Sequence, residues 1–403
     1  MPKLLVIATV PAMLEAFLLP YGRHFRVQGW TVDCAALKAS ASPECRAAFD
    51  HVWDVEWSRN PFDLASVFRS IRTVRKIWQN RQYDLVHVHS PVAAFITRLA
   101  LRKEQREGRT RIVYTAHGFH FHERGGWLRN QAFRSLENLA GRWTDRLIVM
   151  NREDELAAHQ LRSLRPNAIR YMPGIGIDLN RFDACRIDVS AVLREWRERG
   201  ISPEQSNVFL VIAEFIPRKR HADVLKAFAK LPPKNHLVLA GSGTLVPAME
   251  NLATELRIHD RVHFLGQRTD IAAIICVSDA VVLASQQEGL PRSIMEAFAL
   301  ETPIIASDIR GSRDLLRDGR GLLVPVGDVD RIAEAMRCVA RQPKEIEAMV
   351  RRGKKYIEQF RIERLLAMHG ELYAQLLSES YSAIELEHMQ SFPATAEANE
   401  ICR

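Results

Sequence analysis

Two glutamates, Glu288 and Glu296, stand eight positions apart around a predicted strand-to-helix connection. Glu288 follows the apolar run 280–283, Pro291 suits a first helical turn, and Glu296 projects from the helix that follows. Free N–H groups at a helix N-terminus bind phosphate, and carboxylates accept hydrogen bonds from sugar hydroxyls. A nucleotide sugar carries both kinds of group. Taken alone, the two residues also fit a helix that Glu288 caps and on which Glu296 faces solvent.

Strand-like and helix-like segments, which must position such a loop, alternate along the whole chain. Short apolar, β-branched runs are separated by helix-length amphipathic stretches, which is typical of parallel sheets covered by helices on both faces. The predicted strands are 3–9, 31–35, 85–88, 112–115, 146–150, 169–172, 208–213, 236–240, 262–264, 280–283, 304–306 and 321–324. This pattern predicts two doubly wound α/β domains in tandem.

Length and composition agree with two globular domains. The chain has 403 residues, of which 47% are apolar and 26% charged, and about 150 residues make one domain. Apolar runs such as 271–277 fall short of the roughly 20 residues that span a bilayer. The six cysteines are scattered without a C-x-x-C pair, which argues against a disulfide framework or a zinc knuckle. We expect a cytoplasmic protein without a membrane anchor.

The positive charge is unevenly distributed. Residues 1–183 contain 27 Lys or Arg and 18 Asp or Glu, whereas residues 184–403 contain 29 and 30. Such an asymmetry indicates a basic surface that meets an anionic partner: nucleic acid, membrane phospholipid or a phosphorylated acceptor.

The residues around the two glutamates resemble a known family. The run S-x-x-E-G-x-P-x-x-x-x-E-A from Ser285, followed by P-I-I-A-S from Pro303, is similar to the donor-site signature of the retaining glycosyltransferases of family 4. Similar segments cover nearly the whole chain, at 84–89, 114–118, 173–178, 240–244 and 260–266. The resemblance implies an α/β fold of the GT-B type, with two Rossmann-like doubly wound domains facing a central cleft and a C-terminal helix that crosses back to the first domain.

The expected division of the chain follows from the breakers Pro173, Gly174 and Gly176. Residues 1–175 form the predicted acceptor-binding domain and 176–355 the predicted nucleotide-sugar domain. The last long helix is predicted to begin at about residue 343, and its part from 356 to 378 is predicted to cross back to the first domain. Residues 379–403 are predicted to be a weakly ordered tail.

The resemblance assigns roles at the predicted donor site. Glu288 contacts the transferred sugar, Glu296 binds the nucleotide ribose, and Lys219 neutralises phosphate. Other positions complete the predicted substrate-binding site; some offer backbone contacts to the diphosphate or sugar, and some hold the base. These positions are Arg218, Gly241, Gly243, Gly266, Gln267, Arg268, Gly289, Leu290 and Pro291. Fixed cations at a breaking glycosidic bond each contribute roughly 2.7–4 kcal/mol.

The sequence departs from the family pattern at three places. Glu214 stands where relatives usually have an arginine, and Arg218 or Arg220 is the candidate replacement; the basic trio 218–220 also fits a solvated surface cluster. Residues 9–13 replace a Gly-Gly turn after the first strand. Glu301 replaces a glycine before a Thr-Pro turn.

Three histidines follow a predicted strand of the first domain. His117 matches the family histidine that reaches the donor sugar, and is the third predicted catalytic residue beside Glu288 and Lys219. His120 and His122 are expected to bind the acceptor or to pack in an aromatic loop. The H-x-x-H-x-H spacing also suggests metal ligands, but no Cys or Asp completes the set, and the resemblance implies a reaction without metal or cofactor.

A basic amphipathic helix is predicted over 66–82. Its apolar face includes Ile71, Val74 and Trp78, and its polar face carries Arg72, Arg75 and Lys76. This helix could lie on an anionic membrane, or it could pack on its sheet with a solvated basic face; the two are compatible if the basic rim alone touches lipid.

The leading hypothesis is therefore a retaining glycosyltransferase that moves a hexose or N-acetylhexosamine from a nucleotide diphosphate, with UDP the expected carrier, to a saccharide acceptor linked to a polyprenyl diphosphate. Residues 310–316 look most like members of bacterial capsule or exopolysaccharide assembly. The alternatives are a GT-B nucleotide-sugar epimerase, a non-catalytic basic binding subunit and a nucleic-acid-binding protein, although no nucleic-acid motif supports the last.

Overall fold

The computed structural model describes residues 1–403 except 58–62, 122–125, 203, 342 and 391–403. The chain divides into two compact units. Unit 1 comprises 1–148, 158–170 and 366–403, and unit 2 comprises 149–157 and 171–365. The division falls near the breakers at 173–176, yet residues 149–157 join unit 2 although most of their chain neighbours belong to unit 1.

Unit 1 is built on a parallel sheet of seven strands in the order β3-β2-β1-β4-β5-β6-β7. The strands are β1 Lys3–Ile7, β2 Thr31–Ala36, β3 His51–Asp54, β4 Leu85–His89, β5 Arg111–Ala116, β6 Arg146–Val149 and β7 Ile169–Tyr171. The helices that connect them are α1 Pro11–Met13, α2 Leu19–Val27, α3 Pro43–Ala48, α4 Leu64–Arg81, α5 Pro91–Ala100, α6 Arg102–Arg106, α7 Trp127–Gly141 and α8 Arg152–His159. A π-helical turn, Leu14–Leu18, lies between α1 and α2, so the 9–13 segment opens a helix directly.

Unit 2 is built on a parallel sheet of six strands in the order β10-β9-β8-β11-β12-β13. The strands are β8 Val208–Ile212, β9 His236–Ala240, β10 Val262–Gly266, β11 Ala280–Leu283, β12 Ile304–Ser307 and β13 Leu322–Val324. The helices are α9 Ser190–Glu198, α10 His221–Phe228, α11 Val246–Glu255, α12 Ile271–Cys276, α13 Arg292–Ala299, α14 Arg310–Leu316, α15 Val329–Arg341 and α16 Pro343–Ile357.

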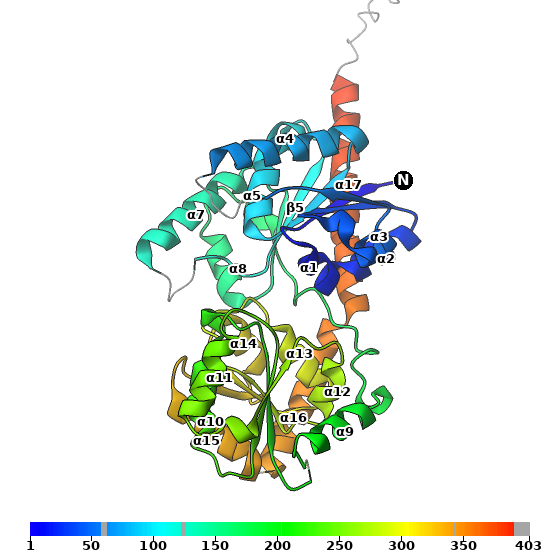
Figure 1. Ribbon diagram of the computed structural model, residues 1–403. Helices are drawn as coiled ribbons and strands as arrows, with labels where there is room; N and C mark the ends of the chain where they lie inside the picture. Colours follow the sequence, from blue (N-terminus) through cyan, green and yellow to red (C-terminus); the bar gives the residue numbers. More distant parts are fainter. Residues whose placement is uncertain (58–62, 122–125, 203, 342, 391–403) are drawn as a thin grey trace, which may run out of the picture. The chain divides into compact units, whose positions relative to one another are not determined.

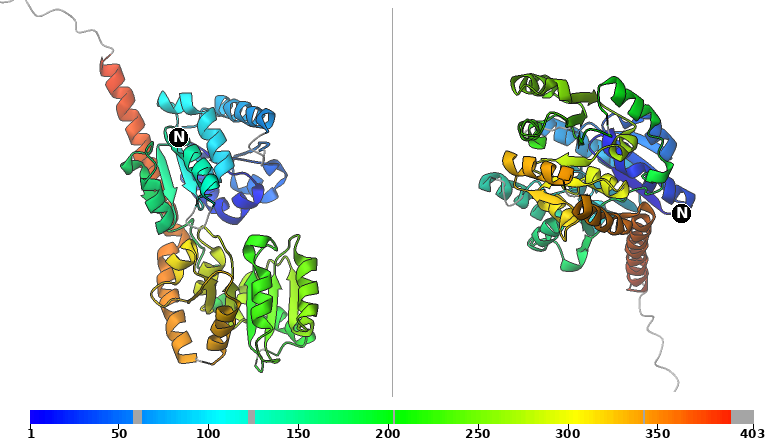
Figure 2. Two further views of the ribbon diagram at one scale, coloured as in Figure 1. Left: turned by 90° about the vertical axis from the view of Figure 1, so that its left-hand side faces the viewer. Right: turned by 90° about the horizontal axis from the view of Figure 1, so that it is seen from below.

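Helices cover both faces of each sheet, as Figures 1 and 2 show. Buried strand runs therefore need apolar side chains on both faces, and β11 and β12 are buried at every position. In unit 2 two apolar clusters lie on opposite faces, one around Trp196 and Phe298 and one around Phe209 and Phe228. This packing fixes the carboxyl ends of the strands, and the loops that carry the candidate site residues start there.

The C-terminal helix α17, Ile362–Gln390, belongs to unit 1 from residue 366 onward. The sequence predicts one helix from about 343 to 378, whereas the structure has α16, a 3₁₀ turn at Glu358–Phe360 and then α17. It also predicts a tail from 379, whereas α17 continues to Gln390. Among the described residues, no helix combines the length and the hydropathy needed to cross a lipid bilayer.

Candidate active site

The loop between β11 and α13 in unit 2 presents Glu288. β11 ends at Leu283, α13 begins at Arg292, and Pro291 is the N-cap residue with φ −72° and ψ 120°. Pro291 therefore precedes the helix rather than lying in its first turn as predicted. Proline suits this place because its φ is fixed near −65° and it has no N–H to satisfy.

Two cations approach the Glu288 carboxylate. Lys219 Nζ lies 2.5 Å from Glu288 Oε1, and both side chains are largely buried, with exposed fractions of 14% and 12%. Arg218 Nη1 lies 4.0 Å from Glu288 Oε2. The structure thus brings together three residues that the sequence placed at one site although they lie 69 and 70 positions apart.

Arg220 is directed elsewhere. Its Nε donates to the Asp223 carboxylate, and its guanidinium lies against Gly327, where a Cβ atom would be 2.9 Å from Nη2. Glu214 is exposed on the preceding loop. Of the two candidate replacements for the family arginine, Arg218 is the one that reaches Glu288.

The peptide groups of Glu288 and Gly289 are held from one side. Arg310 Nε donates to the Glu288 carbonyl oxygen at 3.2 Å, and Asn151 Nδ2 lies 3.4 Å from the Gly289 carbonyl oxygen. In a trans peptide the N–H points opposite to the C=O. The N–H groups of Gly289 and Leu290 therefore point away from Arg310 and Asn151, which leaves them available to an anion on the opposite side.

A buried ion pair supports this arrangement. Arg310 Nη1 lies 2.6 Å from Asp154 Oδ1, and the two side chains are 4% and 1% exposed. Asp154 is itself fixed by Asn151, because Asn151 Nδ2 donates to Asp154 Oδ2 at 2.7 Å and the Asp154 N–H donates to Asn151 Oδ1 at 2.8 Å. The segment 149–157 is thereby tied to the Glu288 loop through side chains.

Close backbone contacts require glycine at three positions near the carboxyl ends of the unit 2 strands. A Cβ on Gly311 would lie 2.0 Å from the Gly289 carbonyl oxygen. A Cβ on Gly241 would lie 2.0 Å from the Ala213 carbonyl oxygen, and one on Gly243 would lie 2.6 Å from that of Phe215. Gly241 and Gly243 thus let the 241–243 loop approach the 213–215 loop, a packing role that the sequence did not predict.

Glu296 lies on α13 and is buried, with an exposed fraction of 8%. Burial raises the pKa of its carboxyl group, and the Arg292 guanidinium, whose Nε is 2.7 Å from Glu296 Oε1, opposes that rise. The Glu296 carboxylate is thus buried and paired with Arg292. It does not face solvent, which was the alternative that the two glutamates alone also allowed.

The predicted base-binding residues follow β10. Gly266 adopts φ 64° and its carbonyl oxygen accepts from the Gly241 N–H at 2.8 Å. Gln267 is exposed. Arg268 lies between Glu195 at 2.8 Å and Asp270 at 2.7 Å, and these two carboxylates raise the pKa of its guanidinium.

Three buried serine hydroxyls lie near this edge of the unit 2 sheet. Ser285 follows β11, Ser307 ends β12 and Ser312 is in α14. Within the described part of the chain, the Oγ atom of each has no hydrogen-bond partner. Buried hydroxyls usually bond to a partner, an ordered water or a ligand, so these atoms mark a polar edge beside the Glu288 loop.

In unit 1, His117 is half-buried and contacts a cluster of buried histidines. His117 Nε2 lies 2.9 Å from His89 Nδ1, and the ring of His89 lies 4.1 Å from that of His87. His87 Nδ1 is 2.5 Å from the hydroxyl of Tyr373 on α17. Burial lowers the pKa of His117 to about 4 and holds the pKa values of His87 and His89 well below their ordinary value.

The other two predicted histidines differ from this cluster. His120 is exposed, and its ring centroid lies 5.1 Å from that of Phe133. His122 lies outside the described residues. In the part of the chain that the structure describes, no three His, Cys, Asp or Glu side chains converge as metal ligands.

The predicted basic helix is α4, and its apolar side packs into unit 1. Val74, Ile77 and Trp78 are 1%, 3% and 4% exposed. Arg72 and Lys76 are exposed, whereas Arg75 is half-buried and its Nε donates to the Ala100 carbonyl oxygen at 3.0 Å. These three side chains make the apolar side of α4 part of the core, whereas Phe68 on the same helix is 61% exposed, and the basic rim faces solvent.

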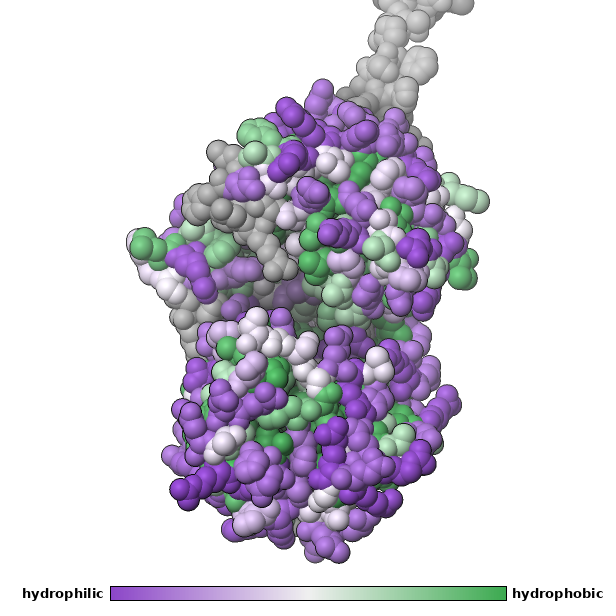
Figure 3. Space-filling view, viewed as in Figure 1, coloured by the Kyte–Doolittle hydropathy of each residue, from purple (hydrophilic) through white to green (hydrophobic). Residues whose placement is uncertain are grey.

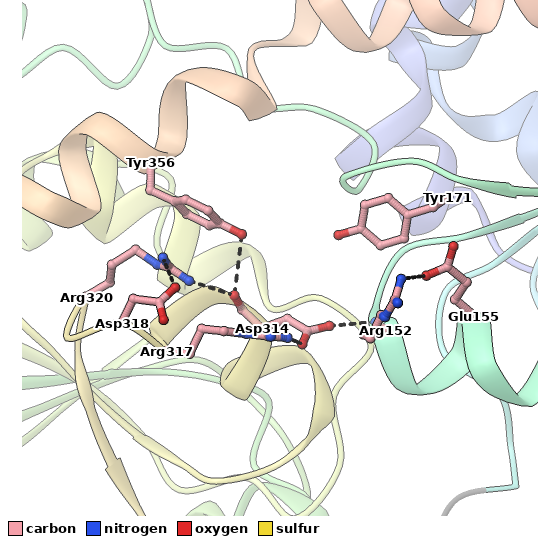
Figure 4. Close-up of a pocket in the computed structure, with 8 residues that line it drawn as sticks. All are labelled: Arg152, Glu155, Tyr171, Asp314, Arg317, Asp318, Arg320 and Tyr356. Carbon is pink, nitrogen blue, oxygen red and sulfur yellow. Dashed lines mark hydrogen bonds and ion pairs between the residues drawn. The ribbon is translucent and has the colours of Figure 1, made fainter.

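A separate pocket of about 340 Å³ lies within unit 2. Figure 4 shows Tyr171 and Tyr356 facing each other across it, with Asp314 below. The lining residues are Arg152, Glu155, Tyr171, Asp314, Arg317, Asp318, Arg320 and Tyr356. Its arginines are engaged by carboxylates, in the pairs Arg152–Glu155, Arg317–Asp314 and Arg320–Asp318. The bond from the Arg152 N–H to Asp314 Oδ2, at 2.7 Å, fastens segment 149–157 to α14.

The sequence analysis assigned no role to Asn151, Asp154 or Arg310. An Asn followed three residues later by an acid, directly after a strand, signals a capped helix start. That signal marks a local structure and does not show that the same side chains contact a loop more than 130 positions away.

Two family models match the chain. Residues 15–181 match the model described as Glycosyltransferase Family 4, and residues 193–356 match the model described as Glycosyl transferases group 1. Together the two matches span most of both sheets.

Individual relatives match two thirds of the chain or more. It is 32% identical to the putative glycosyltransferase EpsD of Bacillus subtilis over 92% of this chain and 96% of that protein. It is 29% identical to a UDP-Gal:alpha-D-GlcNAc-diphosphoundecaprenol alpha-1,3-galactosyltransferase of Escherichia coli over 68% of this chain and 70% of that protein. The crystal structure of Anabaena HepE in complex with UDP and glucose superposes with a TM-score of 0.77, at 19% identity, over 93% of this chain and 100% of that chain. The fold is the GT-B fold.

Proposed function

The chain belongs to the glycosyltransferases of family 4 and group 1, and we propose that it is a retaining enzyme that transfers a hexose or N-acetylhexosamine from a UDP-sugar to a saccharide linked to a polyprenyl diphosphate. The reaction requires no metal or cofactor in this proposal. Lys219 and Arg218 take the charge-neutralising role, and the product belongs to polysaccharide assembly.

The observation that carries this proposal is the Glu288 loop with its two cations. Lys219 Nζ is 2.5 Å and Arg218 Nη1 4.0 Å from the Glu288 carboxylate, and the N–H groups of Gly289 and Leu290 point away from their buried support. A diphosphate at this edge would meet two cations and two amides, while Glu288 would accept hydrogen bonds from the sugar hydroxyls.

The chemistry follows from this arrangement. The acceptor hydroxyl oxygen forms a bond to the anomeric carbon as the bond between that carbon and the diphosphate oxygen breaks, and the hydroxyl proton leaves with the diphosphate. Negative charge grows on the departing oxygen, where Lys219 and Arg218 stabilise it. Glu296 holds the ribose in this proposal.

Named relatives support the choice of donor and acceptor. The E. coli relative is named for transfer from UDP-Gal to a diphosphoundecaprenol-linked sugar, and HepE was crystallised with UDP and glucose. The acceptor belongs to unit 1, which holds 26 Lys or Arg and 19 Asp or Glu residues. A lipid-linked diphosphate and an anionic membrane surface are both attracted by such an excess.

Glu288→Gln tests the reaction. Purified protein is incubated with UDP-sugars and a polyprenyl-diphosphate-linked saccharide, and the product's anomeric configuration is read by NMR. We expect an α-linked product from the wild type, and at least a 10²-fold lower kcat in the variant because the amide cannot balance the cations. Full activity in the variant would remove Glu288 from the site. Conversion of UDP-N-acetylglucosamine without an acceptor would replace transfer by epimerisation.

Arg218→Ala and Arg220→Ala form a matched pair for the leaving-group role. Both remove a cation from the same turn, but Arg218 alone of the two approaches Glu288. We expect kcat to fall about 10²–10³-fold for Arg218→Ala and by less than tenfold for Arg220→Ala. Equal losses would contradict the assignment.

A further inference from the structure

Exposed apolar side chains gather on one helix layer of unit 1. Helices α4, α5 and α7 lie side by side on one face of its sheet (Figure 1). Most of the large apolar side chains that are exposed in the described part of the chain belong to this layer: Phe68, Val92, Trp127, Leu128, Leu136 and Leu139. Four of these six lie on α7.

The exposed side of α7 is an apolar stripe. Leu128, Leu136 and Leu139 are 76%, 42% and 42% exposed, and Ala132 is exposed between them. Positions four and eight residues apart lie along one side of a helix. Trp127, at the start of the helix, is 71% exposed. We call this set the α7 stripe; Figure 3 shows apolar surface at the edge of unit 1 where α7 lies.

The three helices of this layer carry many basic residues and almost no acidic ones, although Arg98 on α5 is buried. In α4, α5 and α7 together there are eight Lys or Arg residues, and Glu137 is the sole acidic residue. Glu137 is already engaged, because Arg98 Nη2 lies 2.9 Å from its Oε2. On α4, the rim next to exposed Phe68 carries Arg69, Arg72 and Lys76.

Lipid headgroups and acyl chains match this combination. Each cation near an anionic bilayer contributes about 1 kcal/mol, and burying a Leu or Phe side chain contributes roughly 1.5–3 kcal/mol. A protein partner of ordinary surface would match the leucines but would need a large acidic patch opposite the cations. α7 has 15 residues, so it can lie in the interface but cannot span it.

We propose that the α7 stripe inserts shallowly into an anionic lipid bilayer while the basic rim of α4 binds its headgroups. This inference deepens the proposed function, and rests on it, by naming the surface on which the lipid-linked acceptor is met. Of the alternatives that the sequence left open, the structure favours the one in which α4 packs on its sheet, because Val74, Ile77 and Trp78 are buried; the α7 stripe then supplies the apolar contact, and only the basic rim of α4 touches lipid. Trp127 and Leu128 are the leading residues of the insertion.

Vesicle co-sedimentation tests the proposal with the full chain. Wild-type protein is mixed with phosphatidylcholine vesicles that contain or lack phosphatidylglycerol. We expect binding that requires phosphatidylglycerol and a loss of at least tenfold in vesicle affinity for Leu128→Glu/Leu136→Glu. Val27→Glu is the matched control, because Val27 is 88% exposed on α2 outside this layer; its affinity should stay within twofold of wild type.

Three outcomes would overturn the proposal: equal affinity of the stripe variant and the Val27→Glu variant, equal binding to vesicles without phosphatidylglycerol, or self-association of the wild type that the stripe variant abolishes while vesicles are not bound. Circular dichroism checks that the variants are folded. Transfer to a water-soluble saccharide acceptor is measured in parallel. If that transfer persists in the wild type while vesicle binding is absent, the inference fails and the proposed function stands. If the wild type transfers sugar neither to this acceptor nor to the polyprenyl-diphosphate-linked one, the proposed function fails.

Discussion

At the scale of single residues, the candidate site depends on side chains that touch no substrate. Asn151 and Arg310 hold the carbonyl oxygens of Gly289 and Glu288, and Asp154 holds both of them. Because these contacts fix the peptide planes, they set the direction of the N–H groups that a diphosphate would meet. Asp154 is therefore a positioning residue in the proposed reaction.

Replacing Asp154 by Asn should damage both the fold and the reaction. The substitution removes the carboxylate that pairs with the buried Arg310 guanidinium, and breaking a buried ion pair costs about 3–5 kcal/mol. We expect kcat to fall more than the donor KM rises, because the loop amides act mainly on the charge that grows on the leaving group. Urea unfolding and steady-state kinetics with a UDP-sugar measure the two effects.

The exposed pair Asp308–Arg313, with side chains 41% and 43% exposed, supplies the control. Asp308→Asn should cost less than about 1 kcal/mol and leave kcat within a few-fold. If the two variants were equally stable and equally active, the buried pair would have no special part in holding the loop.

At the scale of elements, the histidine cluster joins α17 to the sheet of unit 1. His87 on β4 contacts the Tyr373 hydroxyl on α17, and the ring of His369 on α17 lies 5.7 Å from that of His87. His89 and His117 extend the cluster along the carboxyl ends of β4 and β5. Tyr21, on α2, packs edge-on against His369 at 4.9 Å.

This cluster should make unit 1 sensitive to acid. Unfolded histidine titrates near pH 6.5, whereas the pKa of folded His117 is about 4 and those of His87 and His89 are well below 6.5. Below about pH 6.5 the unfolded state therefore binds more protons than the folded state, so the free energy of unfolding falls, by up to about 1.4 kcal/mol per pH unit for each histidine. Above that pH both states are neutral at these groups and the contribution is flat.

Denaturant unfolding at pH 7.5, 6.5 and 5.5 measures this slope. His117→Asn should reduce the change of the unfolding free energy with pH by about the contribution of one histidine. A free energy of unfolding that does not change between pH 7.5 and 5.5 would contradict the assignment.

Several elements could be predicted because their signals are local. Strands β9 and β11 have the predicted limits, since each is a short apolar run that begins at or directly after a polar residue. β3 was missed because His-Val-Trp-Asp at the sheet edge has no apolar run and is exposed at both ends. The break between α16 and α17 was missed because it depends on tertiary pairing: the Ile177 N–H donates to the Phe360 carbonyl oxygen, and the Ile362 N–H donates to that of Ile177.

Glu301 shows how structure can explain a departure from a family pattern. It follows α13 and adopts φ 58°, a left-handed conformation that glycine adopts without strain. The family glycine is thus explained by the backbone, and the glutamate at this position lies 3.5 Å from Lys354 Nζ. No pattern in a single sequence reveals the sign of a φ angle.

At the scale of the whole molecule, the two units carry different charges and, in the proposed reaction, bind different substrates. Unit 2 holds 30 Lys or Arg and 29 Asp or Glu residues, so it is near neutrality, and of its two proposed donor-site cations Lys219 is largely buried, whereas Arg218 is 45% exposed. Unit 1 carries its excess on exposed helices. The halves of the chain predicted this contrast, but not that segment 149–157 belongs to the near-neutral unit, because that depends on contacts with Arg310 and Asp314 far along the chain.

This contrast predicts that salt changes the KM values of the two substrates by different amounts. The Debye length falls from about 10 Å at 0.1 M salt to about 3 Å at 1 M, and exposed charges are screened far more than partly buried ones. We therefore expect the KM for a polyprenyl-diphosphate-linked acceptor to rise at least tenfold over this range, because the exposed cations of unit 1 attract it. The KM for the UDP-sugar should rise less than threefold, because Lys219 is 14% exposed. A neutral saccharide acceptor without the lipid diphosphate serves as the control, and its KM should not respond to salt. A parallel rise in the KM values of donor and lipid-linked acceptor would mean that one shared electrostatic surface, rather than two separate ones, receives both substrates.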